Sequence, residues 1–141
     1  MTVRASHSLR DANLRKSDAM PAAAATTVNG TAIDQGSALT ARGARLADCE
    51  LQLTMPALTA TMVPDTKTMT YSIEMASDVA FSSPTVLWSL VKTGADSAGV
   101  AADTFRQKLP TNCLRYVRAK AVSGANCTDA SSVSMVLELL F

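Results

Sequence analysis

Residues 131–141 read SSVSMVLELLF, and their alternation is the clearest indication of the fold class. Every odd-numbered residue from Val133 to Phe141 is apolar, whereas Ser132, Ser134 and Glu138 fall on the other face. A period of two places alternate side chains on opposite faces of a β-strand. Because chain termini usually fray, we expect this strand to be held in a sheet or against a neighbouring molecule.

Similar patterns recur along the chain and predict further strands over 27–33, 47–55, 69–75, 85–92, 104–109 and 114–122. Turn-forming residues such as Gly30 and Pro110 separate these segments, and no helical periodicity follows residue 20. A fold with parallel strands would need helical crossovers between them. The sequence therefore predicts an all-β domain, an antiparallel β-sandwich or jelly roll.

Tryptophan and cysteine are both assigned to the interior. The stretch 85–92 is apolar on both faces, which favours a central strand with Trp88 in the core. Cys49, Cys113 and Cys127 are odd in number and widely spaced, which fits neither a disulfide framework nor a zinc site. We therefore expect three free thiols whose role is packing.

Residues 1–26 differ from the rest and predict an extended N-terminal arm. The segment is rich in alanine, mildly basic and poor in residues that could build a core. A short helix over 9–16 fits its pattern, but so few turns are marginal in water without support. Composition leaves two readings open, a disordered tail or an arm that becomes ordered on a partner. The chain is thus divided into a flexible arm, 1–26, and a β-sandwich domain, 27–141.

The composition of the 141 residues bounds the classes of function. Charged residues make up 18%, below the usual value of about 25%, which indicates surface hidden in an oligomer. The net charge of +1 argues against a dedicated nucleic-acid binder. The sequence holds no apolar run long enough to span a membrane, and its first residues lack the apolar core of a secretory signal. We expect a protein kept in a cytoplasm, with neither nucleic acid nor membrane as a partner.

Residues that could carry out catalysis are few. The only histidine, His7, lies in the arm, where it has no fixed neighbour to act with. Asp48 and Glu50 share one face of an expected strand, but a solvated surface explains them better than acid–base or metal chemistry. The glycine-containing loop 93–99 lacks the lysine of a phosphate-binding loop. We expect no enzyme activity, no cofactor and no metal.

Contacts with other proteins are the remaining option. Arg115 and Arg118 flank Tyr116 in an expected strand. An RNA-binding sheet would combine such a patch with exposed aromatic residues, so ion pairs with adjoining strands or with a protein neighbour are favoured instead. The unpaired edge of the terminal strand is a further place to meet a second copy. The candidate partner contacts are Arg4, Arg10, Arg15, Met20, Arg42, Arg115, Arg118 and Phe141.

Several segments together carry a resemblance to a known family: 8–11 (SLRD), 18–20 (DAM), 71–74 (YSIE), 93–99 (TGADSAG), 114–118 (LRYVR) and 137–141 (LELLF). In their order and strand character they resemble the small capsid cement, or decoration, proteins of tailed bacteriophages, particularly the family typified by the cement protein of a Bordetella phage. The resemblance implies a jelly-roll-like fold on the outer surface of an icosahedral shell, where it reinforces joints between major capsid subunits. It implies no cofactor and no catalysis.

On this basis we expect a virion protein on the capsid surface, assembled in the cytoplasm of a bacterial host, with the major capsid protein as its partner. Self-association as a trimer or dimer would match the symmetric positions of a shell. Two other classes stay open. A phage tail or adaptor β-protein would have a similar composition. A carbohydrate-binding β-sandwich would need exposed aromatic residues, and the apolar surroundings of Trp88 argue against it.

Overall fold

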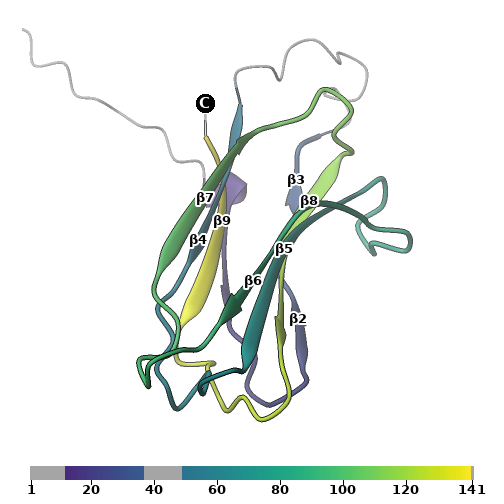
Figure 1. Ribbon diagram of the computed structural model, residues 1–141. Helices are drawn as coiled ribbons and strands as arrows, with labels where there is room; N and C mark the ends of the chain where they lie inside the picture. Colours follow the sequence, from purple (N-terminus) through teal and green to yellow (C-terminus); the bar gives the residue numbers. More distant parts are fainter. Residues whose placement is uncertain (1–11, 37–48, 141) are drawn as a thin grey trace, which may run out of the picture.

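Two β-sheets face each other in the computed structural model, which describes residues 12–36 and 49–140 (Figure 1). The first sheet consists, in spatial order, of β1 (Arg15–Ala19), β9 (Ser134–Leu140), β4 (Glu50–Met55) and β7 (Asp103–Lys108). The second consists of β2 (Thr27–Asn29), β8 (Tyr116–Ser123), β5 (Thr68–Ala76) and β6 (Thr85–Thr93), with β3 (Ile33–Asp34) also paired to β8. These strands pair antiparallel throughout, so the predicted all-β antiparallel sandwich is confirmed.

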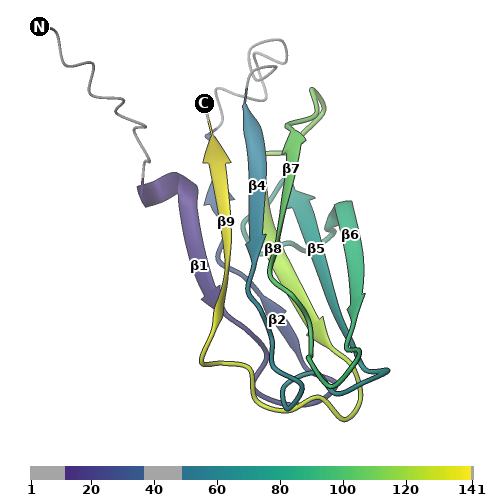
Figure 2. The same ribbon diagram turned by 60° about the vertical axis from the view of Figure 1, so that its left-hand side comes forward.

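Successive strands alternate between the two sheets, apart from the short strands β2 and β3 and the hairpin β5–β6. A 3-10 helix, η1 (Ala12–Leu14), precedes the first strand. Figure 2 shows the order β1, β9, β4 and β7 across the first sheet. Apart from the β5–β6 hairpin, neighbouring strands in each sheet come from distant parts of the sequence, so neither sheet can be completed by one local segment.

The core is filled from both sheets by the alternating apolar residues that the sequence pattern predicts. On β9, Met135, Leu137 and Leu139 are all buried. The buried residues of the other long strands include Leu51, Leu53, Met55, Met69, Tyr71, Ile73, Met75, Val117, Ala119 and Ala121. Burying a large apolar side chain contributes about 1.5–3 kcal/mol, so this interior is the main source of stability.

The terminal strand β9 lies inside its sheet. On one side it pairs with β1, with Lys16 opposite Leu137, and on the other with β4, with Leu53 opposite the same leucine. The expectation that this strand is held in a sheet is confirmed, but the expected unpaired edge for a second copy is wrong. β1 takes that edge because its backbone supplies hydrogen-bond partners that β9 would otherwise lack.

The predicted arm boundary at residue 26 is wrong, because the segment that precedes it belongs to the sandwich. Arg15–Ala19 pairs with β9, and the backbone N–H of Met20 donates to the carbonyl of Val133 at 3.0 Å. Over the described residues 12–16, η1 and the start of β1 take the place of the expected helix. The Asp18 carboxylate accepts hydrogen bonds from the N–H and hydroxyl of Thr31, which ties β1 to the second sheet. Residues 1–11 lie outside the described part of the chain.

β6 is an edge strand, so the predicted central position of residues 85–92 is wrong. Among the described strands it pairs only with β5, and the register shifts at Ile73/Glu74. Trp88 is half-buried and stacks on Phe105 of β7, with ring centroids 4.0 Å apart and planes inclined by 17°. This stacked pair connects the edge strands β6 and β7 of the two sheets. The prediction that Trp88 lies in the core is therefore only partly right, because one face of its ring is packed against Phe105 and the side chain as a whole is half-buried.

Met20 should be a core residue, not a partner contact. We expect Met20→Ala to lower the free energy of unfolding by about 2–4 kcal/mol, the usual cost of truncating a buried methionine, as measured by urea denaturation. Ala22→Ser, two residues further on at an exposed position, serves as the control and should change stability by less than about 0.5 kcal/mol. Equal unfolding midpoints for the two variants would contradict the position of residue 20 in the core.

Substitutions of Gly99 and Gly36 can be compared to test how the loop at Gly99 is packed. Both have positive φ, +78° and +81° respectively, but a Cβ on Gly99 would overlap the carbonyl oxygen of Leu58, whereas one on Gly36 would meet open space. We expect Gly36→Ala to cost about 1 kcal/mol for the backbone conformation alone. Gly99→Ala should cost clearly more, about 3 kcal/mol, because the Leu58–Val100 bridge must also shift. Similar thermal midpoints for the two variants would refute this loop packing.

Candidate interaction surfaces

The predicted partner contacts fall into three groups. Arg4, Arg10, Arg42 and Phe141 lie outside the described residues. Met20 is 1% exposed in the core, so its assignment as a partner contact is wrong. Arg15, Arg115 and Arg118 are described, and the structure does not bring them together. Each pairs instead with a carboxylate on a neighbouring strand.

Arg15 belongs to a polar row that crosses the outer face of the first sheet. Its Nε lies 3.6 Å from Oε2 of Glu138, whose Oε1 accepts a hydrogen bond from the Gln52 amide at 2.7 Å. Arg106 Nε donates to the Gln52 Oε1 at 2.5 Å. The row follows the strand register from β1 through β9 and β4 to β7, and the two central side chains are buried. Its geometry links four strands, which is a structural role.

Arg115 fixes the short strand β3 to β8. Its Nε and one terminal nitrogen each donate to Asp34 at 2.8 Å, in the forked geometry favoured by guanidinium and carboxylate. The guanidinium also lies 5.0 Å from the centre of the Tyr116 ring. The hydrogen bond from Arg115, helped by the N–H of Gly36, lowers the pKa of Asp34 to about 2. The Nε and terminal nitrogen of Arg115 are thus already engaged within the chain.

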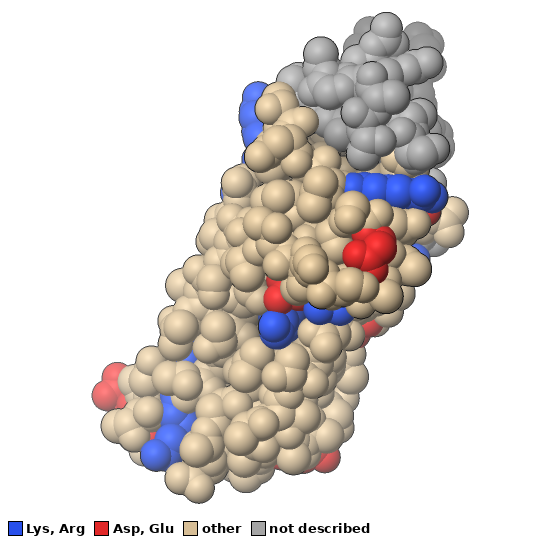
Figure 3. All heavy atoms as spheres, turned by 90° about the vertical axis from the view of Figure 1, so that its right-hand side faces the viewer, with Lys and Arg blue, Asp and Glu red and all other residues tan. Residues whose placement is uncertain are grey.

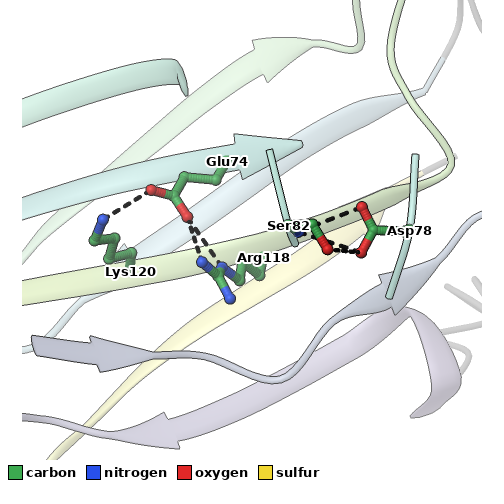
Figure 4. A network of polar contacts seen from close by, with 5 residues as sticks. All are labelled: Glu74, Asp78, Ser82, Arg118 and Lys120. Atoms are coloured by element: carbon green, nitrogen blue, oxygen red, sulfur yellow. Dashed lines mark hydrogen bonds and ion pairs between the residues drawn. The ribbon is translucent and has the colours of Figure 1, made fainter. Parts of the chain in front are cut away.

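Arg118 and Lys120 enclose Glu74 on the outer face of the second sheet (Figure 4). Arg118 donates to one carboxylate oxygen at 3.0 and 2.8 Å, and Lys120 donates to the other at 2.9 Å. Glu74 is only 2% exposed. Burial by itself raises the pKa of Glu74, but the hydrogen bonds from Lys120 and Arg118 outweigh it and hold the pKa below its usual value.

The loop between β5 and β6, residues 77–84, folds against this ion pair. The Phe81 ring lies 4.1 Å from the Arg118 guanidinium and is buried there, although its φ of +53° is unfavourable for a bulky residue. The Asp78 carboxylate accepts hydrogen bonds from the N–H and hydroxyl of Ser82 (Figure 4). Strained conformations persist where the surroundings over-determine them and often mark functional segments. The loop is therefore held in one shape while it presents Val79 to solvent.

The exposed large apolar side chains of the described residues all lie in this region. Val79 is 68% exposed in the loop, and Val86 and Val91 are 55% and 56% exposed on β6. Figure 3 shows this side of the molecule, on which charged side chains are few and most of the visible surface is uncharged. We call residues 77–93 the β6 surface. Exposed apolar side chains that all come from one segment of the chain favour a site of protein–protein contact there.

Other chemistry finds little support in the described part of the chain. It contains no cluster of three or more side chains that could hold a metal ion. A hollow of about 360 Å³ is lined by Ala57, Leu58, Thr59, Ala98, Gly99, Val100 and Ala101, which supply no ionisable side chain. No helix among the described residues is long and apolar enough to cross a membrane. Cys113 and Cys127 are free thiols as predicted, and burial raises the pKa of Cys113 despite a hydrogen bond from Gln35.

Sequence reasoning missed the β6 surface because it treated 85–92 as a central strand. The available signal was the serine- and proline-containing stretch before it, 81–84, which marks a longer connection. The sequence favoured an ion pair between Arg118 and an adjoining strand, but it could not name Glu74 as the partner, because that depends on the β5–β8 register that sets Glu74 opposite Arg118.

Glu74→Gln tests the ion pair through its pH dependence. We expect the change to lower the free energy of unfolding by about 1–3 kcal/mol at neutral pH, because two cations lose their charged acceptor. The folded-state pKa of Glu74 lies below the unfolded one, so its stabilisation is present above the unfolded pKa and is lost as pH falls through the folded one. The stability gap between wild type and variant should thus shrink as pH falls below about 4.3, the usual unfolded pKa of glutamate, in urea unfolding followed by tryptophan fluorescence. A gap that stays constant as pH falls would contradict the assignment.

Comparison with known proteins adds no family to this picture. No protein-family model matches the sequence, and no curated protein matches it. What the chain does is therefore inferred from its own residues and surfaces.

Proposed function

We propose that this chain is a structural protein of a bacteriophage virion that binds the outer capsid surface and cements neighbouring major capsid subunits. The observation that carries the proposal is the β6 surface, an exposed apolar region presented by a braced loop on a rigid sandwich. A monomer gains nothing from leaving these side chains in water, whereas a binding partner would bury them.

The ion pairs of the outer faces support a role in assembly. Each of the described arginines from the predicted contacts is used to hold strands of its own chain together. A protein that reinforces a joint between subunits must transmit force without deforming, and cross-strand links on both sheets oppose such deformation. The proposed role requires no catalysis, cofactor or metal.

The finer fold assignment is a jelly roll. If β2 and β3 are counted as one interrupted strand on β8, the chain has eight strands in two sheets of four. The alternation of successive strands between the sheets, with a single hairpin at β5–β6, supports this topology. It agrees with the family that the sequence resembles.

The partners in this proposal are the major capsid protein and further copies of the chain. Its place is the capsid surface of virions assembled in the host cytoplasm. Many modest contacts repeated over a lattice give strong overall attachment without a tight single site. Of the β6 surface, Val79 at the loop is the natural contact with the capsid, because a rigid apolar anchor loses little conformational freedom on binding.

Co-sedimentation with DNA-filled capsids that lack bound decoration protein tests this function. We expect wild-type protein to bind until a fixed ratio to capsid subunits is reached. Val79→Asp should weaken binding at least about tenfold, since it places a charge in the buried centre of the contact. Thr104→Asp, an exposed change on β7 of the other sheet, is the control and should bind like wild type. Failure to saturate capsids, or binding to isolated tails instead, would refute the proposal.

A further inference from the structure

The outer strands of the two sheets differ in how they are protected against pairing with another chain. β7 carries Asp103, Arg106 and Lys108, and β1 carries Arg15, Lys16 and Asp18. β2 and β3 are only three and two residues long. Charged side chains and short length are the usual devices that keep sheet edges from pairing.

β6 lacks these devices over its middle. It is nine residues long, and Lys92 is its only charged residue. The Lys92 ammonium is turned towards β7, where it lies 2.8 Å from the Asp103 carboxylate and donates to the carbonyl of Ala101. The register shift opposite Ile73/Glu74 affects the other end of the strand. The segment Trp88–Val91 between them has neither charge nor bulge.

The core next to this edge is incompletely covered. Leu87, Trp88 and Leu90 of β6 and Phe105 of β7 pack against the buried cluster but remain half-buried. A further strand beside β6 would complete their burial if its inward side chains were apolar and its outward ones small or polar. β6 itself has this composition, with Trp88 and Leu90 alternating with Ser89.

We propose that β6 pairs antiparallel with β6 of a second copy across a two-fold axis near Leu90, so that the second sheet runs continuously through both copies. In this register Ser89 of one copy lies opposite Val91 of the other, on the outer face. Trp88 lies opposite Lys92 of the other copy, and the two lysines stay about 13 Å apart along the strands. The pairing therefore provides hydrogen-bond partners for the exposed backbone groups of both β6 strands, and it places no like charges opposite one another. It deepens the proposed function by naming its self-association surface, and it leaves Val79 for the capsid.

A charge exchange at Val91 tests this geometry. The two Val91 side chains of the dimer are diagonal neighbours about 7–8 Å apart, and each is exposed in the single chain, so substitution should leave the fold intact. We expect wild type to dimerise in sedimentation equilibrium at about 1–500 µM, the range suited to a small interface. Val91→Glu and Val91→Lys should each raise the dimer Kd at least about tenfold. An equimolar mixture of the two should recover dimerisation, because opposite charges then face each other.

Controls and alternative outcomes separate this inference from the capsid role. Thr104→Glu and Thr104→Lys on β7 should dimerise like wild type. If a Val91 variant unfolds by circular dichroism, Ser89→Glu and Ser89→Lys at the other exposed outward position provide the same test. A monomeric wild type, a dimer insensitive to these charges, or a mixture that stays monomeric would each overturn the β6 pairing. Capsid binding by such a protein would still support the proposed function, and a β6 dimer that ignores capsids would refute that function alone.

Discussion

The first sheet depends on one constraint, the insertion of the last strand between two earlier ones. β9 pairs with β1 and β4 at the same time, and its inward residues Met135, Leu137 and Leu139 form a large part of the core. Until β9 is in place, β1 has no described partner and β4 has only β7. Contacts between such distant segments require costly loop closure before they contribute stability. The sandwich is therefore expected to form cooperatively, once most of the chain is available.

Charge on the outer faces is used mainly inside the chain. The row from Arg15 to Arg106, the Arg115–Asp34 fork and the Glu74 ion pair each join neighbouring strands. Glu74 and Glu138 are buried although they point outward, so removing a partner would leave a desolvated carboxylate uncompensated. Because these cations are engaged, the exposed apolar side chains on residues 77–93 are left as the more distinctive feature for recognition.

The β6 surface combines two kinds of contact that serve different geometries. The loop at Val79 offers a rigid apolar anchor. Its shape is held by the stacking of the Arg118 guanidinium over the Phe81 ring and by the hydrogen bond that Ser82 donates to Asp78. The strand edge offers backbone donors and acceptors, which suit a partner that approaches as a strand. A protein that pairs with a second copy through the strand edge and attaches to a shell through the Val79 loop would span a joint between subunits.

The amino-acid pattern was enough to specify the fold class and most of the interior, because a period of two along a strand assigns each side chain to a face. It predicted correctly that 131–141 contains a strand held in a sheet, with the alternating residues Met135, Leu137 and Leu139 on its inward face. It placed Met20 outside and Trp88 in a central strand, since nothing local distinguishes a strand with one neighbour from a strand with two. The assembled sandwich was needed to show which strands lie at the edges, which carboxylate each arginine meets, and where apolar surface stays exposed. These properties depend on the register between segments distant in sequence, and the local pattern carries no information about that register.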